Sequence, residues 1–155
     1  MKIFVFDIDN TIIIHTNQNN NFYNKKTESR LPSILSHINK DLIYIYTNGT
    51  FGHGKGVIEN LKLSNQVKRI FARDNIPWMK PYINSFRYVN NIINKESNSS
   101  QNEIIFFDDL EENLMTAKQI GWNTVWISPD FLKKKKYIDY SFPNIYEALI
   151  YFNKN

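Results

Sequence analysis

Two aspartates separated by one residue follow an apolar run at the start of the chain. Residues 3–6 (Ile-Phe-Val-Phe) lead directly into Asp7, and Asp9 stands two positions later. Two carboxylates this close repel each other unless a cation lies between them or their roles differ. A divalent metal, together with a division of labour between a nucleophile and a proton donor, satisfies both conditions. The pair therefore predicts metal-assisted chemistry at the end of a strand.

A second acidic pair follows another apolar run. Residues 104–107 (Ile-Ile-Phe-Phe) end at Asp108 and Asp109. An acidic cluster assembled from two strand ends suits Mg²⁺, which prefers oxygen ligands and keeps waters that a phosphate can replace. Alone, Asp108 and Asp109 could simply cap the helix that follows them.

Two further segments offer groups that suit phosphate oxygens. Thr47 and the amides of Asn48 and Gly49 follow a third apolar run, and Lys80 stands in a loop before a helical pattern. A hydroxyl, exposed backbone amides and one lysine are common partners of phosphate oxygens. Each motif alone would be weak evidence, but their order on successive strands favours a catalytic site.

Alternating strands and helices must position these groups. Apolar runs predict five strands, over residues 2–6, 43–46, 68–72, 103–107 and 124–127. Helical spacing of apolar residues predicts helices over residues 31–38, 57–61, 82–93, 110–117 and 145–152. A loop or flap is expected over residues 15–30, and a glycine-spaced turn at Gly52, Gly54 and Gly56.

The alternation predicts an α/β fold, a three-layer α/β/α sandwich around a mainly parallel, Rossmann-like, five-stranded sheet. Strands one to three are expected on one side, and strands four and five on the other side of strand one. The reversal of strand order then falls between strands one and four, beside both acidic pairs, which is where ligands bind in such sheets.

Size and composition fit a single globular domain spanning residues 1–155. Hydrophobic residues make up 42% and charged residues 22% of the chain, the net charge is +4, and cysteine is absent. These values argue against disorder, disulfides and a thiolate metal site. Neither a signal peptide nor a membrane-spanning run is apparent, so we expect a cytoplasmic protein. The oligomeric state is left open.

Together, the motifs resemble those of the haloacid dehalogenase (HAD) superfamily of phosphotransferases. In order along the chain, the four motifs of that superfamily are matched by residues 7–11 (Asp-Ile-Asp-Asn-Thr), Thr47, Lys80 with Pro81, and Asp108 with Asp109. The resemblance covers nearly the whole chain. It implies a HAD-like fold and a Mg²⁺-dependent phosphatase, a phosphomonoester hydrolase acting through an aspartyl-phosphate.

The resemblance also implies a role for each matched residue. Asp7 would be the nucleophile, and Asp9 would protonate the leaving oxygen and then activate water. Thr47 and the Asn48 amide would hold phosphate oxygens, and Lys80 would neutralise charge on Asp7 and on the transferring group.

The same resemblance implies the ligands of the metal. Mg²⁺ would be held by Asp7, the backbone carbonyl of Asp9, Asp108 and Asp109, the last directly or through water. The residues expected to support these ligands are Thr11 and Asn113.

Within the superfamily, the short intervals between motifs leave no room for a separate cap domain. A capless site would be open to a bulky phosphate on a protein, a sugar or another large molecule. The length, residues 106–109 (Phe-Phe-Asp-Asp) and residues 113–121 are similar to the magnesium-dependent phosphatase family. The sequence departs from that family at Asn10, where an aromatic is usual, and at Thr47-Asn48-Gly49, and it resembles capped nucleotidases there.

The sequence is also compatible with other functions. A nucleotide or polynucleotide-end phosphatase is favoured by a basic run that could track a phosphodiester backbone, namely Lys133, Lys134, Lys135 and Lys136. A phospho-acceptor switch and a non-catalytic binding module are alternatives of other classes. His15 and His53 could reach the mouth of the site, and Trp78 is expected to pack or anchor its loop rather than stack on substrate.

Overall fold

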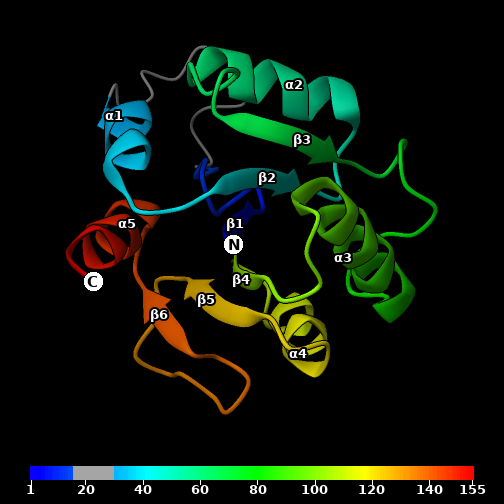
Figure 1. The fold of residues 1–155 in the computed structure, drawn as a ribbon. Helices are drawn as coiled ribbons and strands as arrows, with labels where there is room; N and C mark the ends of the chain where they lie inside the picture. The colour runs from blue at the N-terminus through cyan, green and yellow to red at the C-terminus, as the bar shows by residue number, and fades with distance from the viewer. Residues whose placement is uncertain (16–29) are drawn as a thin grey trace.

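A computed structural model describes residues 1–15 and 30–155 of the chain (Figure 1). In chain order, the elements of this part are β1 (Lys2–Phe6), α1 (Arg30–His37), β2 (Leu42–Tyr46), α2 (Phe51–Asn60), β3 (Val67–Phe71), α3 (Ile83–Ser97), β4 (Glu103–Asp108), α4 (Glu111–Gln119), β5 (Asn123–Ile127), β6 (Tyr140–Phe142) and α5 (Ile145–Lys154).

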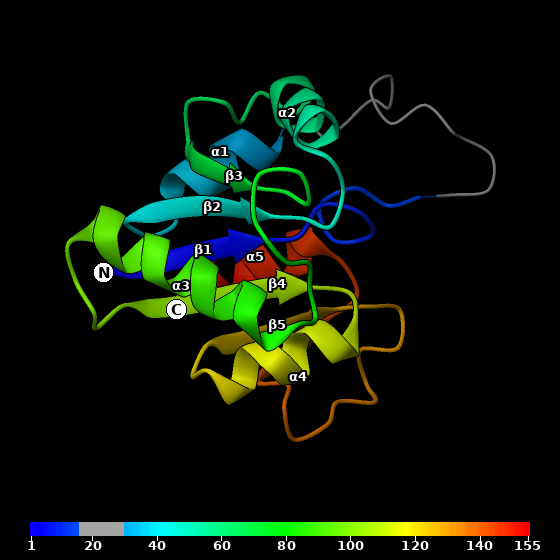
Figure 2. The same cartoon turned by 90° about the vertical axis from the view of Figure 1, so that its right-hand side faces the viewer.

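The strands form one parallel sheet in the order β3-β2-β1-β4-β5-β6. The central strand β1 pairs on one side with β2, where Phe6 faces Ile45, and on the other with β4, where Phe6 faces Phe107. The strand order therefore reverses between β1 and β4, as predicted. Figure 2 shows β1, β2, β3 and β4 side by side, with their arrowheads toward one common edge of the sheet.

Within residues 1–15 and 30–155, the sheet has six strands rather than the five predicted. The additional strand, β6, spans Tyr140–Phe142 and pairs with β5 at one margin of the sheet. It is only three residues long and none of them is fully buried. A short marginal strand carries no sustained apolar run, which is why the sequence pattern did not predict it.

Helices cover both faces of the sheet and complete the predicted α/β/α sandwich. Side chains of successive strand residues point to opposite faces, so Ile3 and Val5 pack with α3 and α4, whereas Phe4 and Phe6 pack with α1, α2 and α5. In Figure 1, α3 and α4 accordingly lie on one side of the strands, and α1 and α5 lie on the other.

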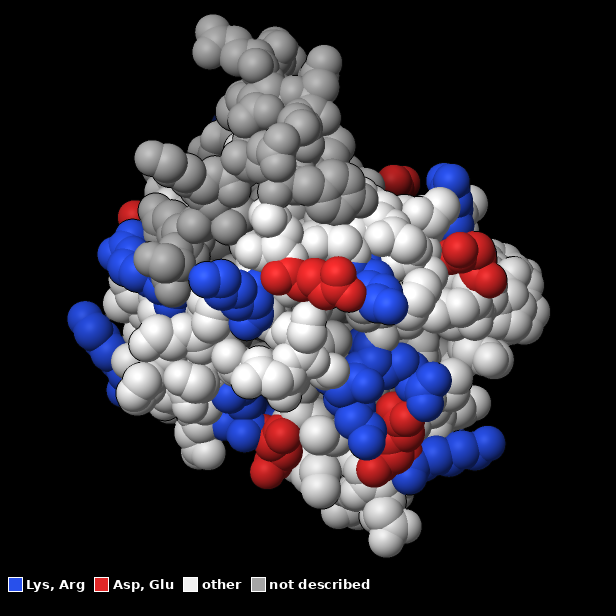
Figure 3. Space-filling view, turned by 90° about the horizontal axis from the view of Figure 1, so that it is seen from above, with Lys and Arg blue, Asp and Glu red and all other residues white. Residues whose placement is uncertain are grey.

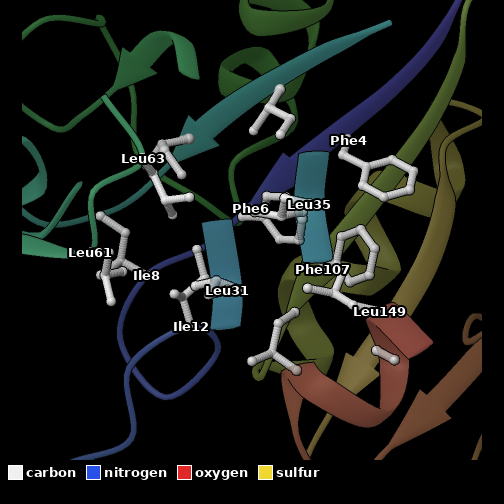
Figure 4. Close-up of a cluster of buried hydrophobic side chains, with 14 of the residues drawn as sticks. Phe4, Phe6, Ile8, Ile12, Leu31, Leu35, Leu61, Leu63, Phe107 and Leu149 are labelled. Atoms are coloured by element: carbon white, nitrogen blue, oxygen red, sulfur yellow. The ribbon is translucent and has the colours of Figure 1, made fainter. Parts of the chain in front are cut away.

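Phenylalanines from the two central strands form the middle of one core layer (Figure 4). The ring of Phe107 lies 4.5 Å from that of Phe6 and 5.4 Å from that of Phe4, measured between centroids. All three rings are buried, and helix residues such as Leu35 and Leu149 close over them. Burying side chains of this size contributes about 1.5–3 kcal/mol each, so β1 and β4 are held firmly beside each other.

The glycine-spaced segment forms a helix rather than the predicted turn. Gly52, Gly54 and Gly56 lie inside α2, whose N-terminus is capped by the Thr50 hydroxyl. Gly54 is buried, and a Cβ there would lie 3.2 Å from the Ile70 side chain, so a small residue allows α2 to approach β3.

The structure describes little of the predicted flap, and it also bears on membrane insertion. The predicted flap over residues 15–30 lies almost wholly outside the described residues, of which Arg30 begins α1. Among the helices in the described part of the chain, none has the length and apolar character needed to cross a bilayer.

Candidate active site

The predicted site residues meet at the carboxyl edge of the sheet. Asp7 follows β1, Thr47 follows β2, and Asp108 ends β4. A cleft of 230 Å³ opens at this edge. Its lining consists of Asp7, Asp9, Asn10, Thr47, Asn48, Gly49, Lys80, Asp109, Leu110 and Asn113. Asp108 does not line the cleft and is fully buried.

A group of charges, the inner cluster, consists of the buried residues Asp7, Lys80 and Asp108 and the partly exposed Asp109. The ammonium group of Lys80 lies 3.2 Å from Asp7 Oδ1 and 2.8 Å from Asp108 Oδ2. One oxygen from each of the three carboxylates lies within 4.8 Å of the others. Three carboxylates therefore face one ammonium group, and negative charge is in excess.

This crowding perturbs the titration of the inner cluster. Burial raises the pKa of Asp7 well above its usual value, and the charge of Asp108 raises it further, whereas Lys80 lowers it. Burial and the charge of Asp108 likewise raise the pKa of Asp109. For Lys80, burial alone lowers the pKa, but the charges of Asp108 and Asp7 outweigh it and hold the pKa above its usual value.

Lys80 is fixed in place by contacts at both ends of the residue. Its backbone N–H donates to Asn48 Oδ1 and its carbonyl accepts from Asn48 Nδ2, both at 2.9 Å. Its ammonium group donates to the Tyr46 carbonyl at 2.8 Å and lies 5.0 Å from the centre of the Tyr46 ring. The side chain is 1% exposed, so the charge stays oriented toward the carboxylates.

The segment after β2 brings its hydroxyl and amides to the same cleft. Thr47 is buried, and its Oγ1 accepts a hydrogen bond from the Gly49 N–H at 3.0 Å. Thr47, Asn48 and Gly49 all line the cleft, together with Asp7, Asp9 and Asp109.

Two polar side chains support the carboxylates. Thr11 Oγ1 donates to Asp7 Oδ2 at 3.1 Å. Asn113 Nδ2 donates to Asp108 Oδ2 at 3.1 Å, and the Leu110 N–H donates to Asp108 Oδ1 at 2.9 Å. Thr11 therefore contacts Asp7, and Asn113 contacts Asp108, while their supporting roles remain a prediction.

The donor set fits a hard divalent cation. The carboxylates of the inner cluster supply oxygen ligands close enough to share one ion, and their excess negative charge favours one. Asn113 Oδ1 is buried and accepts no hydrogen bond in the described part of the chain, so it could accept one from a metal-bound water. In the described part of the chain, Asp7, Asp108 and Asp109 are thus side chains that could hold such a cation.

Asp9 has quite different surroundings. Its side chain is 37% exposed, and its Oδ1 lies 2.8 Å from His15 Nε2 and 3.1 Å from His53 Nε2. The sequence placed both histidines near the mouth of the site but gave no signal that they share one carboxylate oxygen. The pairing of the Asn48 side chain with the Lys80 backbone was also missed, because it joins residues 32 positions apart.

The predicted basic run does not line the cleft, and its charges are partly paired. Lys135 lies 2.8 Å from Glu111, Lys133 lies 3.7 Å from Asp130, and Lys134 donates to the Asp139 carbonyl.

On the α2 side of the molecule, which Figure 3 views from above Figure 1, Lys and Arg side chains are interspersed with Asp and Glu. That visible face therefore carries charges of both signs.

Trp78 lies partly exposed in the loop that leads to Lys80. Its ring centre is 6.2 Å from that of Tyr82 and 6.4 Å from that of Tyr88. The Trp78 carbonyl accepts a hydrogen bond from Ser85. These contacts fit the expected role of anchoring the loop.

Compared as a sequence, the chain matches no protein-family model and no curated protein. Three solved structures illustrate the similarity of its fold. YfnB of Bacillus subtilis, classed as a HAD hydrolase and solved with magnesium bound, aligns with a TM-score of 0.60 and 24% identity over 77% of this chain and 53% of its own. L-2-haloacid dehalogenase of Xanthobacter autotrophicus aligns with a TM-score of 0.59 and 12% identity over 78% of this chain and 58% of its own.

A smaller structure aligns over almost its full length. SP0104 of Streptococcus pneumoniae, a haloacid dehalogenase-like hydrolase, gives a TM-score of 0.62 and 13% identity over 97% of both chains. This chain thus spans little more than half of the first two proteins and nearly all of the third. At these identities the likeness establishes the fold, and the chain has the fold of the HAD-superfamily hydrolases.

Proposed function

We propose that this chain is a single catalytic domain, residues 1–155, that hydrolyses phosphomonoesters with the help of Mg²⁺. The observation that carries the proposal is the inner cluster, in which Asp7 stands at the end of the central strand against Lys80 and beside two further carboxylates. A phosphatase of the HAD type needs these groups in this arrangement. The HAD-like fold supports the proposal, although the aligned proteins include dehalogenases as well.

The first step would transfer the phosphoryl group to the protein. A carboxylate oxygen of Asp7 attacks phosphorus, the bond from phosphorus to the leaving oxygen breaks, and its electron pair goes to that oxygen. Asp9 donates a proton to the departing oxygen. Lys80 holds positive charge beside the transferring group, and Thr47 and the Asn48 amide bind its oxygens.

The second step would return Asp7 to its starting state. Water attacks phosphorus of the aspartyl-phosphate, and Asp9 takes a proton from that water. The bond between phosphorus and the Asp7 oxygen breaks, and inorganic phosphate leaves. The same carboxyl group thus acts as acid and then as base, which leaves Asp9 ready for another turnover.

A bound divalent cation would neutralise negative charge on the inner cluster and on the phosphate, so that like charges do not repel. Asp7, the Asp9 carbonyl, Asp108 and Asp109 would hold it. Burial raises the pKa of Asp7, and a nucleophile must be ionised, so the need for positive charge beside it is strong.

The surroundings of Asp9 favour turnover over a phospho-acceptor switch. A switch keeps its phosphoryl group, whereas Asp9 lies in the cleft beside Asp7 and is open to water. Between the first motif and Lys80, the described chain has only α1, β2, α2 and β3 and no separate cap unit, so the substrate could be bulky. The proposed reaction is the same for three candidate classes of substrate, namely phosphoproteins, sugar phosphates and nucleotides.

The test is hydrolysis of a panel of phosphomonoesters with Mg²⁺ and with EDTA. The panel comprises p-nitrophenyl phosphate, nucleotides, sugar phosphates, a phosphotyrosine peptide and an oligonucleotide with a terminal phosphate. Phosphate release that requires Mg²⁺ is expected from at least one member. Uptake of phosphate on Asp7 without release from any member would replace the phosphatase with a switch.

Substitution of the four lysines 133–136 by Ala tests the nucleic-acid version of this function. Polynucleotide binding should be lost, and turnover of small substrates kept, if that version holds. Unchanged polynucleotide binding would mean that the four lysines are ordinary surface residues without a role in binding nucleic acid.

A further inference from the structure

Two histidines from different parts of the chain hold the same oxygen of Asp9. His15 follows the turn after β1, His53 lies in the first turn of α2, and both Nε2 atoms lie within hydrogen-bond distance of Asp9 Oδ1. Since a carboxylate oxygen only accepts, both nitrogens must carry a proton when Asp9 is ionised. No hydrogen bond reaches Oδ2 from any described residue, and Asp9 lines the cleft.

The turn after β1 is built to return His15 to Asp9. Asn10 has a φ of 60°, a left-handed conformation that Asn tolerates better than most residues. Its Oδ1 accepts a hydrogen bond from the His15 N–H at 3.1 Å. An aromatic side chain at position 10 would offer no such acceptor. The departure from the magnesium-dependent phosphatase pattern at Asn10 therefore has a structural use.

The start of α2 is built to admit the ring of His53. The Thr50 hydroxyl caps the helix by accepting the His53 N–H at 3.1 Å. A Cβ at Gly49 would lie 3.3 Å from His53 Cδ2 and 3.3 Å from Thr47 Oγ1. A side chain at position 49 would therefore crowd the ring against the threonine. The second departure, at positions 47–49, thus also makes room for a histidine on Asp9.

We propose that His15 and His53 are positioning residues that hold Asp9 by Oδ1, so that Oδ2 is the oxygen that exchanges protons during catalysis. This inference rests on the proposed phosphatase function. In the first step, Oδ2 gives its proton to the leaving oxygen as the bond to phosphorus breaks. In the second step, Oδ2 takes a proton from the attacking water. Neither histidine gains or loses a proton in either step.

The two histidines would fix the orientation of the Asp9 carboxylate. Asp9 is more than one-third exposed, and an exposed carboxylate rotates among several rotamers. A misplacement of about 1 Å in a catalytic group can cost about 10²-fold in rate. Two donors from separate elements fix the carboxylate plane, which a single donor would leave free to turn.

The test compares two classes of leaving group. An alkoxide needs a proton from Asp9 to depart, whereas p-nitrophenolate departs without one. The ratio kcat/KM covers the steps through departure of the leaving group, so slow hydrolysis of the intermediate does not obscure it. We would measure it for glycerol phosphate and p-nitrophenyl phosphate with H15A, H53A, the double variant, and the matched H15Q and H53Q variants. H37A is the control, because His37 lies exposed on α1 and bonds only within that helix in the described structure.

The alanine variants should lose about 10–100-fold on glycerol phosphate and less than about threefold on p-nitrophenyl phosphate, since only the positioning of the acid is disturbed. The glutamine variants, which keep a donor near the place of Nε2, should recover most of the loss, and H37A should behave as the unmodified protein. Equal losses on both substrates would overturn the inference while leaving the phosphatase intact. An unmodified protein inactive on every phosphomonoester would instead overturn the proposed function, and the inference with it.

A second measurement does not depend on activity or on the stability of the variants. Proton–nitrogen NMR correlations of the imidazole rings should show protonated Nε2 atoms on both His15 and His53 of the unmodified protein. An Nδ1–H tautomer on either histidine would overturn the inference.

Discussion

Asp7 and Asp9 leave the same strand two residues apart and reach opposite surroundings. Asp7 is buried in the inner cluster, against an ammonium group and the Thr11 hydroxyl. Asp9 stands in the open cleft and is held by two imidazoles. Closely spaced carboxylates can thus receive different tasks from burial and partners alone.

The difference suits the two proposed tasks. A nucleophile needs a fixed direction and counter-charges, and it is better shielded from water, which would compete for phosphorus. An acid–base group must meet both a leaving oxygen and a water, so it needs exposure as well as orientation. The inner cluster supplies the first set of conditions, and the contacts around Asp9 supply the second.

The largest effect is expected from removing the proposed nucleophile. Asp7→Asn keeps the shape of the side chain but removes its nucleophilic oxygen, so turnover should fall to background and no phospho-intermediate should form. Phosphate release and the intact mass of the quenched protein measure both. Asp130→Asn, at an exposed site outside the cleft, is the control. Near-normal turnover by Asp7→Asn would show that the nucleophile is misassigned.

A smaller loss is expected from Asp9→Asn. An amide cannot exchange the proton, so kcat should fall about 10²–10⁴-fold, the usual range for general acid–base catalysis. KM should change little, because Asp9 is not assigned to binding of the phosphate group. Steady-state kinetics on the preferred substrate gives both values. A loss confined to KM would move Asp9 from acid–base chemistry to binding.

Removing the lysine of a buried ion pair should lower the free energy of unfolding more than removing the lysine of an exposed one. Lys80→Met leaves the carboxylates of the inner cluster uncompensated, which should lower the free energy of unfolding by about 3–5 kcal/mol. Lys118→Met removes a pair with Asp139 that is 40% exposed on the lysine side, and should cost about 0–1 kcal/mol. Urea denaturation in EDTA measures both. Similar costs would contradict the buried character of the inner cluster.

A change smaller than that of Lys80→Met is expected in how strongly Mg²⁺ stabilises the protein at different pH values. The pKa values of Asp7 and Asp109 are raised in the folded protein, so without metal these groups bind protons more tightly than in the unfolded chain. Their contribution to stability is therefore present at low pH and decreases as the pH rises above about 4. Mg²⁺ competes with those protons, so its stabilisation should grow over the same range, to about 2.7 kcal/mol at one hundred times the Kd.

Thermal unfolding at several pH values, with Mg²⁺ and with EDTA, measures this difference. Asp109→Asn should weaken the effect of Mg²⁺ at every pH. Stabilisation by Mg²⁺ that is constant from pH 4 upward would mean that the ion binds elsewhere.

The strand order and the inner cluster could be predicted because they depend on local patterns. Apolar runs that end in Asp7, Thr47 and Asp108 mark strand ends, and the rules of parallel sheets bring those ends together. The contacts of His15 and His53 could not be predicted, because they depend on the φ of Asn10 and on the space beside Gly49. Neither property appears in a hydrophobic pattern. Strand β6 was not predicted because its three residues form no sustained apolar run.

The most direct test of the central claim is to find where the phosphoryl group is held. The protein would be mixed with Mg²⁺ and p-nitrophenyl phosphate, quenched in acid and reduced with borohydride, which converts an aspartyl-phosphate into homoserine. Peptide mass spectrometry would then locate the converted residue. Our account predicts conversion at Asp7 and none at Asp9 or Asp109. Conversion at either of those residues, or turnover without any converted residue, would contradict it.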